Sequence, residues 1–189
     1  MYQVLGFDIS SSAIGWAVLS IDGYKISYHD SGYIKPTKKG LLLEILDKTQ
    51  VQIENLFTKY QPDYIGIEEI IKYMPDTSTA TTIIKLATFN RMIGLSAYQY
   101  LVSKNQPAPQ MCNVLAIRHA LKFTSDLPAK SDMPELVAKH LNISFPYEYK
   151  KTGTPREENQ DRADSIAVAL YYAKILTGEK KLKKRKTKK

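Results

Sequence analysis

"LGFDISSSAIGWAVL", residues 5–19, combines an apolar, strand-like run with a carboxylate, Asp8, near its end. Three serines follow, and a second apolar run begins directly after them. An isolated buried charge is costly unless it is paired, hydrogen-bonded or bound to a metal ion. We therefore expect other side chains of this protein, or a cation, to stabilise Asp8.

Outward from this stretch, the hydrophobic pattern predicts an α/β fold. Residues 2–9, 13–20 and 24–34 form three hairpin-connected strands, which indicates an antiparallel meander. A helical repeat over 41–60 precedes a strand over 64–70, so this helix is a crossover that sets the first and fourth strands parallel. The rest predicts a helix over 78–104, a strand at 111–117 running into a short helix, a helix from 131 or 132 to 142, a loop over 145–159 and a final helix over 160–177.

The composition indicates one globular domain followed by a basic tail. The 27 basic and 19 acidic side chains give a charge of +8, and eight of the bases lie in residues 180–189. We expect residues 1–178 to form the domain and 179–189 a disordered tail, which either binds phosphate loosely or serves for solubility or targeting. The sequence has no apolar run of membrane-spanning length and no signal peptide pattern. Its single Cys112 excludes an intramolecular disulfide and suits a cytoplasmic location.

Two predicted strands carry the same local pattern, a glycine two residues before an acid. The first strand contains "GFD" at residues 6–8 and the fourth contains "GIE" at residues 66–68. Side chains alternate along a strand, so Gly6 shares a face with Asp8, and Gly66 shares a face with Glu68. Glycine in a strand often marks the close approach of another backbone or of a ligand. We therefore expect two neighbouring carboxylates beside a surface where another element packs tightly.

The final helix supplies two further acids on its core-facing side. Asp161 and Asp164 are three residues apart and share a face that continues through Val168 and Tyr171. Each acid alone fits a structural cap or a strand-end charge, but together they predict a cluster of four. Such a cluster cannot stay fully ionised by itself, so either some of the acids are protonated, with strongly raised pKa values, or cations neutralise them. Hard oxygen ligands of this kind select Mg²⁺ or Mn²⁺. Two such ions held about 3.5–4 Å apart are the usual means of in-line displacement at phosphorus.

The segments "LGFDISSSAIGWAVL", "PDYIGIEEI" and "DRADSIAVAL" resemble the three acidic motifs of RuvC-type Holliday-junction resolvases, in the ribonuclease H-like superfamily. The resemblance spans residues 2–177 and implies a five-stranded mixed sheet with helices on both faces. It implies a homodimer that nicks branched DNA with two Mg²⁺ ions per site, for which Mn²⁺ can substitute. The catalytic, metal-binding acids would be Asp8, Glu68, Asp161 and Asp164. The long loop and the basic tail depart from the family pattern and suggest a phage or viral member.

A nuclease also needs cations that hold the phosphates of its substrate. In the family, basic residues before the final helix contact DNA near the scissile bond, and the resemblance carries this role to Arg118, Lys122 and Lys130. Arg118 and Lys122 are four residues apart, so we expect them to share a helix face. The full set of DNA-contacting candidates is Arg118, Lys122, Lys130, Lys150, Lys151, Arg156 and Tyr73, the last for stacking on an unpaired base. Each of these bases also fits ordinary solvated surface, and Tyr73 a half-buried aromatic.

Two alternative functions are open: a nuclease with the same acids and another substrate, and a DNA-binding protein without catalytic activity. A nuclease acting on flaps or RNA-containing substrates would need the same cluster, because the acids determine the hydrolysis and not the nucleic acid. A catalytically silent branched-DNA-binding protein is the other alternative, although such proteins tend to lose these acids. Actin-like ATPases and sugar kinases also begin with an Asp-led strand–turn–strand, but 189 residues with nine glycines lack the second half and the phosphate loops they require.

Overall fold

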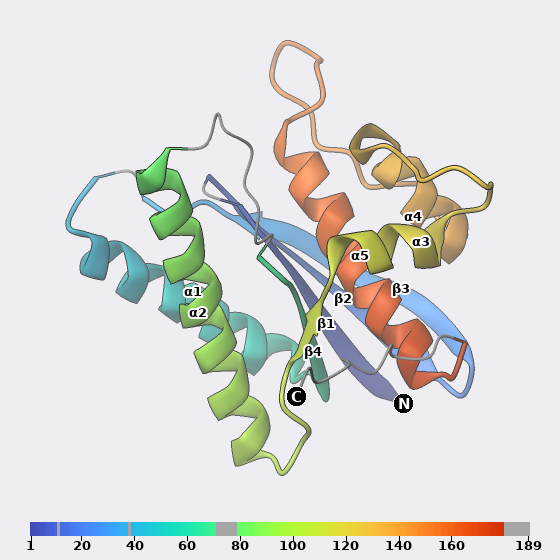
Figure 1. The fold of residues 1–189 in the computed structure, drawn as a ribbon, viewed down its shortest axis with the longest axis horizontal. Helices are drawn as coiled ribbons and strands as arrows, with labels where there is room; N and C mark the ends of the chain where they lie inside the picture. Colours follow the sequence, from blue (N-terminus) through green and yellow to red (C-terminus); the bar gives the residue numbers. More distant parts are fainter. Residues whose placement is uncertain (11, 38, 71–78, 180–189) are drawn as a thin grey trace, which may run out of the picture.

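A five-stranded mixed sheet in the order β3-β2-β1-β4-β5 forms the centre of the protein (Figure 1). The structure is a computed structural model that describes residues 1–10, 12–37, 39–70 and 79–179. The strands are β1 (Tyr2–Ile9), β2 (Ile14–Asp22), β3 (Lys25–Ile34), β4 (Tyr64–Glu68) and β5 (Gln110–Cys112). β1, β2 and β3 pair antiparallel, while β4 pairs parallel with both β1 and β5. The predicted meander and the parallel pairing of the first and fourth strands are confirmed.

Five helices and a 3₁₀ turn, η1, complete the described part of the fold. They are α1 (Leu42–Tyr60), α2 (Ala80–Ser103), α3 (Val114–Leu121), η1 (Lys130–Asp132), α4 (Met133–Leu141) and α5 (Glu158–Leu176). The fifth strand is shorter than predicted, because the side chain of Asn113 accepts hydrogen bonds from the backbone of Leu115 and Ala116 and starts α3 there. In the described ranges, no helix has both the length and the apolar composition needed to cross a membrane.

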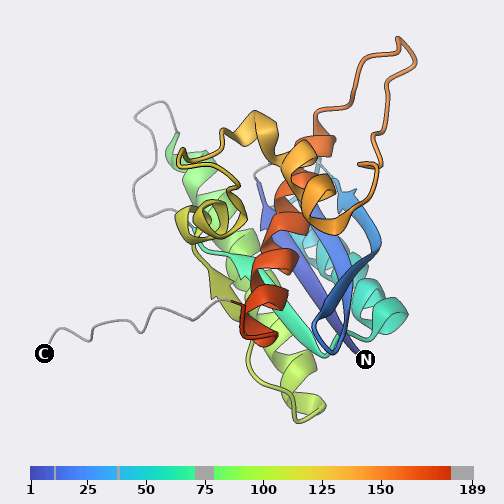
Figure 2. The same ribbon diagram turned by 90° about the vertical axis from the view of Figure 1, so that its right-hand side faces the viewer.

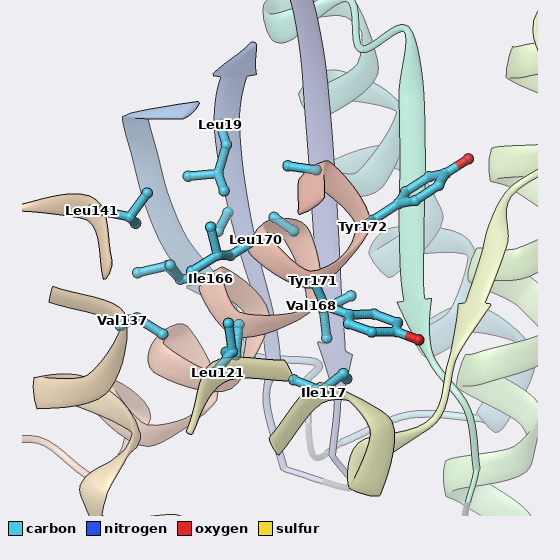
Figure 3. Packing of buried hydrophobic residues seen from close by; sticks show 14 of the residues in the cluster. Leu19, Ile117, Leu121, Val137, Leu141, Ile166, Val168, Leu170, Tyr171 and Tyr172 are labelled. Atoms are coloured by element: carbon cyan, nitrogen blue, oxygen red, sulfur yellow. The ribbon is translucent and has the colours of Figure 1, made fainter. Parts of the chain in front are cut away.

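The helices cover both faces of the sheet, as predicted (Figures 1 and 2). α1 and α2 pack on the face that carries Leu5 and Phe7 of β1. α3, α4 and α5 pack on the opposite face, which carries Val4. Figure 3 shows this second core, where Ile166 and Leu170 of α5 lie among side chains of β2, α3 and α4. Burial on both faces explains why β1 is apolar at nearly every position.

α5 lies directly on the backbones of the strands at three glycines. A Cβ atom added to Gly6 would lie 2.5 Å from the carbonyl oxygen of Ser165, and one added to Gly15 would lie 2.0 Å from that of Asp161. At Gly66 the nearest atom would be Cγ1 of Val168, at 3.2 Å. The close packing predicted from Gly6 and Gly66 is therefore present. It sets the height and register of α5 over the edge where β1 and β4 end.

Candidate active site

Two acids stand side by side at this edge of the sheet. β1 and β4 pair with Phe7 opposite Ile67, so the next residues, Asp8 and Glu68, are neighbours. Asp8 is only 5% exposed, and its Oδ2 atom has no hydrogen-bond partner within the described residues. Each of these two acids lies close enough to act on the charge of the other. Two ionised carboxylates at such close range repel each other, so the pair favours protonation or a bound cation.

Burial and mutual repulsion disfavour negative charge on this pair. Burial, followed by the nearby carboxylates of Glu68 and Asp164, raises the pKa of Asp8 well above its ordinary value. Burial and the charge of Asp164 raise the pKa of Glu68 to about 7. The pair therefore holds fewer negative charges at neutral pH than two ordinary acids would. A cation placed between the side chains would reverse this.

The acids of α5 lie against the same pair. Burial is the main cause that raises the pKa of both Asp161 and Asp164, and the charges of these two acids act on Asp8. Ser10, in the turn that follows β1, is among the neighbours that lower the pKa of Asp161. Asp164 accepts a hydrogen bond of 3.2 Å from Nε2 of Gln160. The structure thus brings the four predicted acids into one electrostatically coupled cluster.

Lys130 supplies positive charge within this cluster. Its Nζ atom lies 3.1 Å from Oδ2 of Asp164. Burial disfavours the charge of Lys130, but attraction to Asp164, Asp8 and Asp161 outweighs it and raises the pKa of the lysine. Nε2 of Gln160 also donates to the carbonyl oxygen of Lys130, at 2.8 Å, and so ties η1 to α5. Sequence reasoning missed Gln160, although its position four residues before Asp164 places both on one face of the helix.

Arg118 and Lys122, the other two predicted bases of this region, differ in what they interact with. The charge of Arg118 in α3 lowers the pKa of both Glu68 and Asp164, so Arg118 acts on the cluster electrostatically. Lys122 is the C-cap of α3 and has extended backbone angles, and its Nζ donates to the carbonyl oxygen of Ser125 at 2.7 Å. α3 ends at Leu121, but the backbone nitrogen of Lys122 still donates to the carbonyl oxygen of Arg118, one turn earlier, so the predicted shared face of these two residues stays a prediction.

The predicted loop before α5 is a projecting hairpin (Figure 2). The isolated bridge between Tyr149 and Pro155 closes it, and Lys151 is exposed at its tip. Nζ of Lys150 lies 3.1 Å from Oε1 of Glu157, in an ion pair exposed to solvent. Nε of Arg156 lies 3.9 Å from Oε2 of Glu148. These bases flank the first turn of α5, but none of them is paired with an acid of the cluster.

Two polar residues of α5 fix the base of this hairpin, and sequence reasoning missed both. The side-chain amide of Asn159 accepts from the backbone nitrogen of Glu148 at 2.9 Å and donates to its carbonyl oxygen at 2.8 Å. The buried guanidinium of Arg162 donates to the carbonyl oxygen of Pro146 at 2.7 Å. Their partners lie in an irregular segment, so no spacing rule could have identified them. The remaining candidates, Tyr73 and the tail at 180–189, lie outside the described residues.

The cluster fits a hard divalent cation in chemistry, although it is not a ready-made cage. In the described ranges, no three or more His, Cys, Asp or Glu side chains converge closely enough to hold a metal ion in their present positions. The acidic donors are all oxygens, as Mg²⁺ and Mn²⁺ prefer. The buried, unpartnered Oδ2 of Asp8 is a ligand atom that such an ion would satisfy. Asp8, Glu68, Asp161 and Asp164 are therefore the side chains that could hold a metal ion, once they move closer together than they lie here.

Comparison with known proteins gives one consistent result. The family model of the crossover junction endodeoxyribonuclease RuvC matches residues 4–172. A RuvC of Orientia tsutsugamushi is 32% identical over 106 residues, which cover 56% of this chain and 64% of the relative's length. A RuvC of Helicobacter pylori is 27% identical over 175 residues, covering 92% of this chain and 98% of the relative.

Solved structures agree in fold. Thermus thermophilus RuvC in complex with Holliday junction substrate has a TM-score of 0.68 at 17% identity, covering 92% of this chain and 94% of that one. The yeast mitochondrial Holliday junction resolvase has a TM-score of 0.65 at 16% identity, covering 90% of this chain and 77% of that one. The expected ribonuclease H-like architecture is confirmed.

Proposed function

Since the chain belongs to the RuvC family of crossover junction endodeoxyribonucleases, we propose that it nicks branched DNA, Holliday junctions in particular, by metal-dependent phosphodiester hydrolysis. The observation that carries the proposal is the buried Asp8 of β1, whose Oδ2 is unpartnered in the described residues and whose pKa is raised by the charges of Glu68, Asp164 and Asp161 from β4 and α5. Acids that repel one another in a half-buried site are unfavourable when ionised, and a bound cation would remove this repulsion.

In this mechanism, Asp8, Glu68, Asp161 and Asp164 hold two Mg²⁺ ions, for which Mn²⁺ can substitute. Bound there, the ions would activate the attacking water and stabilise the leaving oxygen. Glycines 6, 15 and 66 hold α5 on the sheet, so the acids from the strands and from the helix keep a fixed relation. The surrounding apolar core excludes water from Asp8 and strengthens every charge interaction in the site.

The proposed DNA contacts surround the acids. The charge of Arg118 acts on the cluster from α3, and Lys130 reaches it from η1, so both lie where a scissile phosphate would approach. Lys150, Lys151 and Arg156 would hold the flanking phosphates from the hairpin, and Lys122 from the end of α3. Tyr73 as a stacking residue, and 179–189 as a basic tail outside a domain of residues 1–178, remain part of the proposal.

A homodimer is also proposed, because symmetric resolution of a four-way junction needs two active sites. α2 offers a surface for it. The face of α2 opposite its buried residues carries side chains at alternating spacings of four and three: Ile84, Thr88, Arg91, Leu95, Tyr98 and Val102. Leu95 is 58% exposed, Tyr98 49% and Val102 48%. Such spacing places these side chains in one row along the helix, and the apolar part of the row, Leu95, Tyr98 and Val102, is of the kind that packs against a second helix.

A cleavage assay tests the proposal. Labelled four-way junction, flap, linear duplex and RNA–DNA hybrid would be incubated with the protein and either Mg²⁺ or EDTA. We expect nicking of the junction in Mg²⁺ alone. Asp8→Asn should abolish nicking yet leave junction binding intact, because binding rests on the basic residues. Asp22→Asn, at the exposed last residue of β2, is the matched control and should nick normally.

The same assay separates the alternatives. Preferential cutting of the flap or of the hybrid would keep the mechanism and change the substrate. Junction binding with no cleavage in Mg²⁺ or Mn²⁺ would make the protein a silent branched-DNA-binding protein. Normal cleavage by Asp8→Asn would contradict the proposed mechanism itself.

A further inference from the structure

We propose that Lys130 is the internal counter-ion of the acid cluster and competes with a divalent cation for Asp164, so that cation binding displaces its ammonium group from the acids. The proposal rests on the proposed function, because it takes the four acids as the cation site. It differs from the expected role of Lys130 as a simple DNA contact. It assigns the lysine one position in the protein before a cation binds and another afterwards.

The ion pair between Lys130 and Asp164 has one partner that is sheltered from solvent. The side chain of Asp164 is 12% exposed, and the ammonium of Lys130 lies 3.1 Å from it. The exposed pair between Lys150 and Glu157 has side chains that are 48% and 89% exposed. An ion pair with one sheltered partner is screened less by solvent and salt than a pair with two exposed partners. Lys130 thus reaches inward to a shielded carboxylate.

The charges of all four acids respond to this one lysine. The ammonium of Lys130 lowers the pKa of Asp8 and of Glu68, although burial still leaves both raised. For Asp161 and Asp164 too, the charge of Lys130 is the largest of the influences that lower the pKa. A divalent cation would act on the same oxygens. An ammonium group and a divalent ion on one carboxylate repel each other, so they cannot both keep that position.

The backbone of Lys130 is held by α5, and its side chain is 56% exposed. Nε2 of Gln160 donates to the carbonyl oxygen of Lys130 at 2.8 Å and to Oδ1 of Asp164 at 3.2 Å. η1 therefore stays attached to α5 when the ion pair opens. The four-carbon stem of lysine then lets the ammonium swing outward from a fixed point. The displaced charge stays at the rim of the cluster, where it can meet a phosphate of the substrate.

Cation affinity measured without DNA tests the proposal. Calorimetric titration of Mn²⁺ into the EDTA-treated, dialysed protein would compare wild type with Lys130→Met, which keeps a long stem and removes the charge. We expect the variant to bind Mn²⁺ about tenfold more tightly or better, because no ammonium has to be displaced. Lys139→Met is the control, since that lysine lies over the ring of Phe123 at 4.3 Å from its centroid and should leave the affinity unchanged.

A second measurement covers the case in which Lys130→Met does not fold without cation. The same protein would be prepared in Mg²⁺ and titrated with a chelator, and Lys130→Gln would be measured in parallel. Both variants should need more chelator than wild type to release the ion. Equal or weaker affinity in both variants would overturn the role of Lys130 alone. Absence of binding in wild type and variants alike would overturn the proposed function, and this inference with it.

Discussion

Gly15→Ala should damage both the stability of the protein and its proposed activity, because α5 rests on the backbone at this residue. A Cβ atom at Gly15 would lie 2.0 Å from the carbonyl oxygen of Asp161 and 2.5 Å from its carbonyl carbon. Ordinary contact begins at 3.4 Å, so the first turn of α5 would have to rise by 1.4 Å. Overpacking of this kind costs about 1–3 kcal/mol of unfolding free energy.

The same displacement moves two of the four acids away from the other two. Asp161 and Asp164 ride on the lifted turn, whereas Asp8 and Glu68 stay on the sheet. A misplacement of about 1 Å in a catalytic arrangement costs on the order of 100-fold in rate. We therefore expect single-turnover junction cleavage in Mg²⁺ to slow by about that factor, with junction binding little changed.

Gly94→Ala is the matched control for this experiment. Gly94 lies in α2, and a Cβ atom there would meet nothing within 4 Å. Alanine in a helix is favoured over glycine, so this variant should gain up to about 1 kcal/mol in a urea titration and cut at the normal rate. If Gly15→Ala unfolded and cut like wild type, the direct contact between α5 and β2 would not be what positions the acids.

Three further predictions concern other parts of the structure. In EDTA, urea titrations should show the unfolding free energy falling from about pH 5 to 8. The folded protein holds the proton of Glu68 up to a pKa of about 7, against 4.5 ordinarily, so ionisation destabilises it, and saturating Mg²⁺ should reduce the fall. Leu95→Glu combined with Tyr98→Lys should halve the mass measured by light scattering if α2 is the dimer surface, and an unchanged dimer would remove α2 from that role. Burial raises the pKa of the Cys112 thiol to about 12, so iodoacetamide should label it in unfolded but not in native protein, as mass spectrometry would report.

Much of the fold was predictable because it depends on local periodicity. The alternation in β1 and β2 and the helical repeat of α1 identified the meander, the crossover and the parallel pairing of β1 with β4. The matched positions of Gly6 and Gly66 also predicted a close approach of another element. Local patterns do not specify the residue at which a strand ends and a helix begins. For this reason the sequence did not indicate that Asn113 caps α3 and ends β5 at Cys112.

The acids of the candidate site were predictable as a set, but their surroundings were not. Asp8, Glu68, Asp161 and Asp164 are marked by strand and helix periods, which the sequence displays directly. The ion pair of Lys130 with Asp164 joins residues 34 positions apart across an irregular segment. The contact of Gly15 with Asp161 depends on how deeply α5 sinks into the sheet. Such distances follow from three-dimensional packing, which one-dimensional spacing does not encode.

The hydrogen bonds of Asn159 and Arg162 hold the base of the hairpin and leave its tip free to vary in sequence. At the tip, Thr152 and Thr154 are exposed and bond to each other, so substitutions there disturb little of the fold. At the base, the hairpin is anchored to the same helix that carries Asp161 and Asp164. The sequence of the tip, and with it the proposed DNA contacts there, can therefore change without moving the proposed catalytic acids. The part of the hairpin that would meet DNA is in this way separable from the part that holds α5.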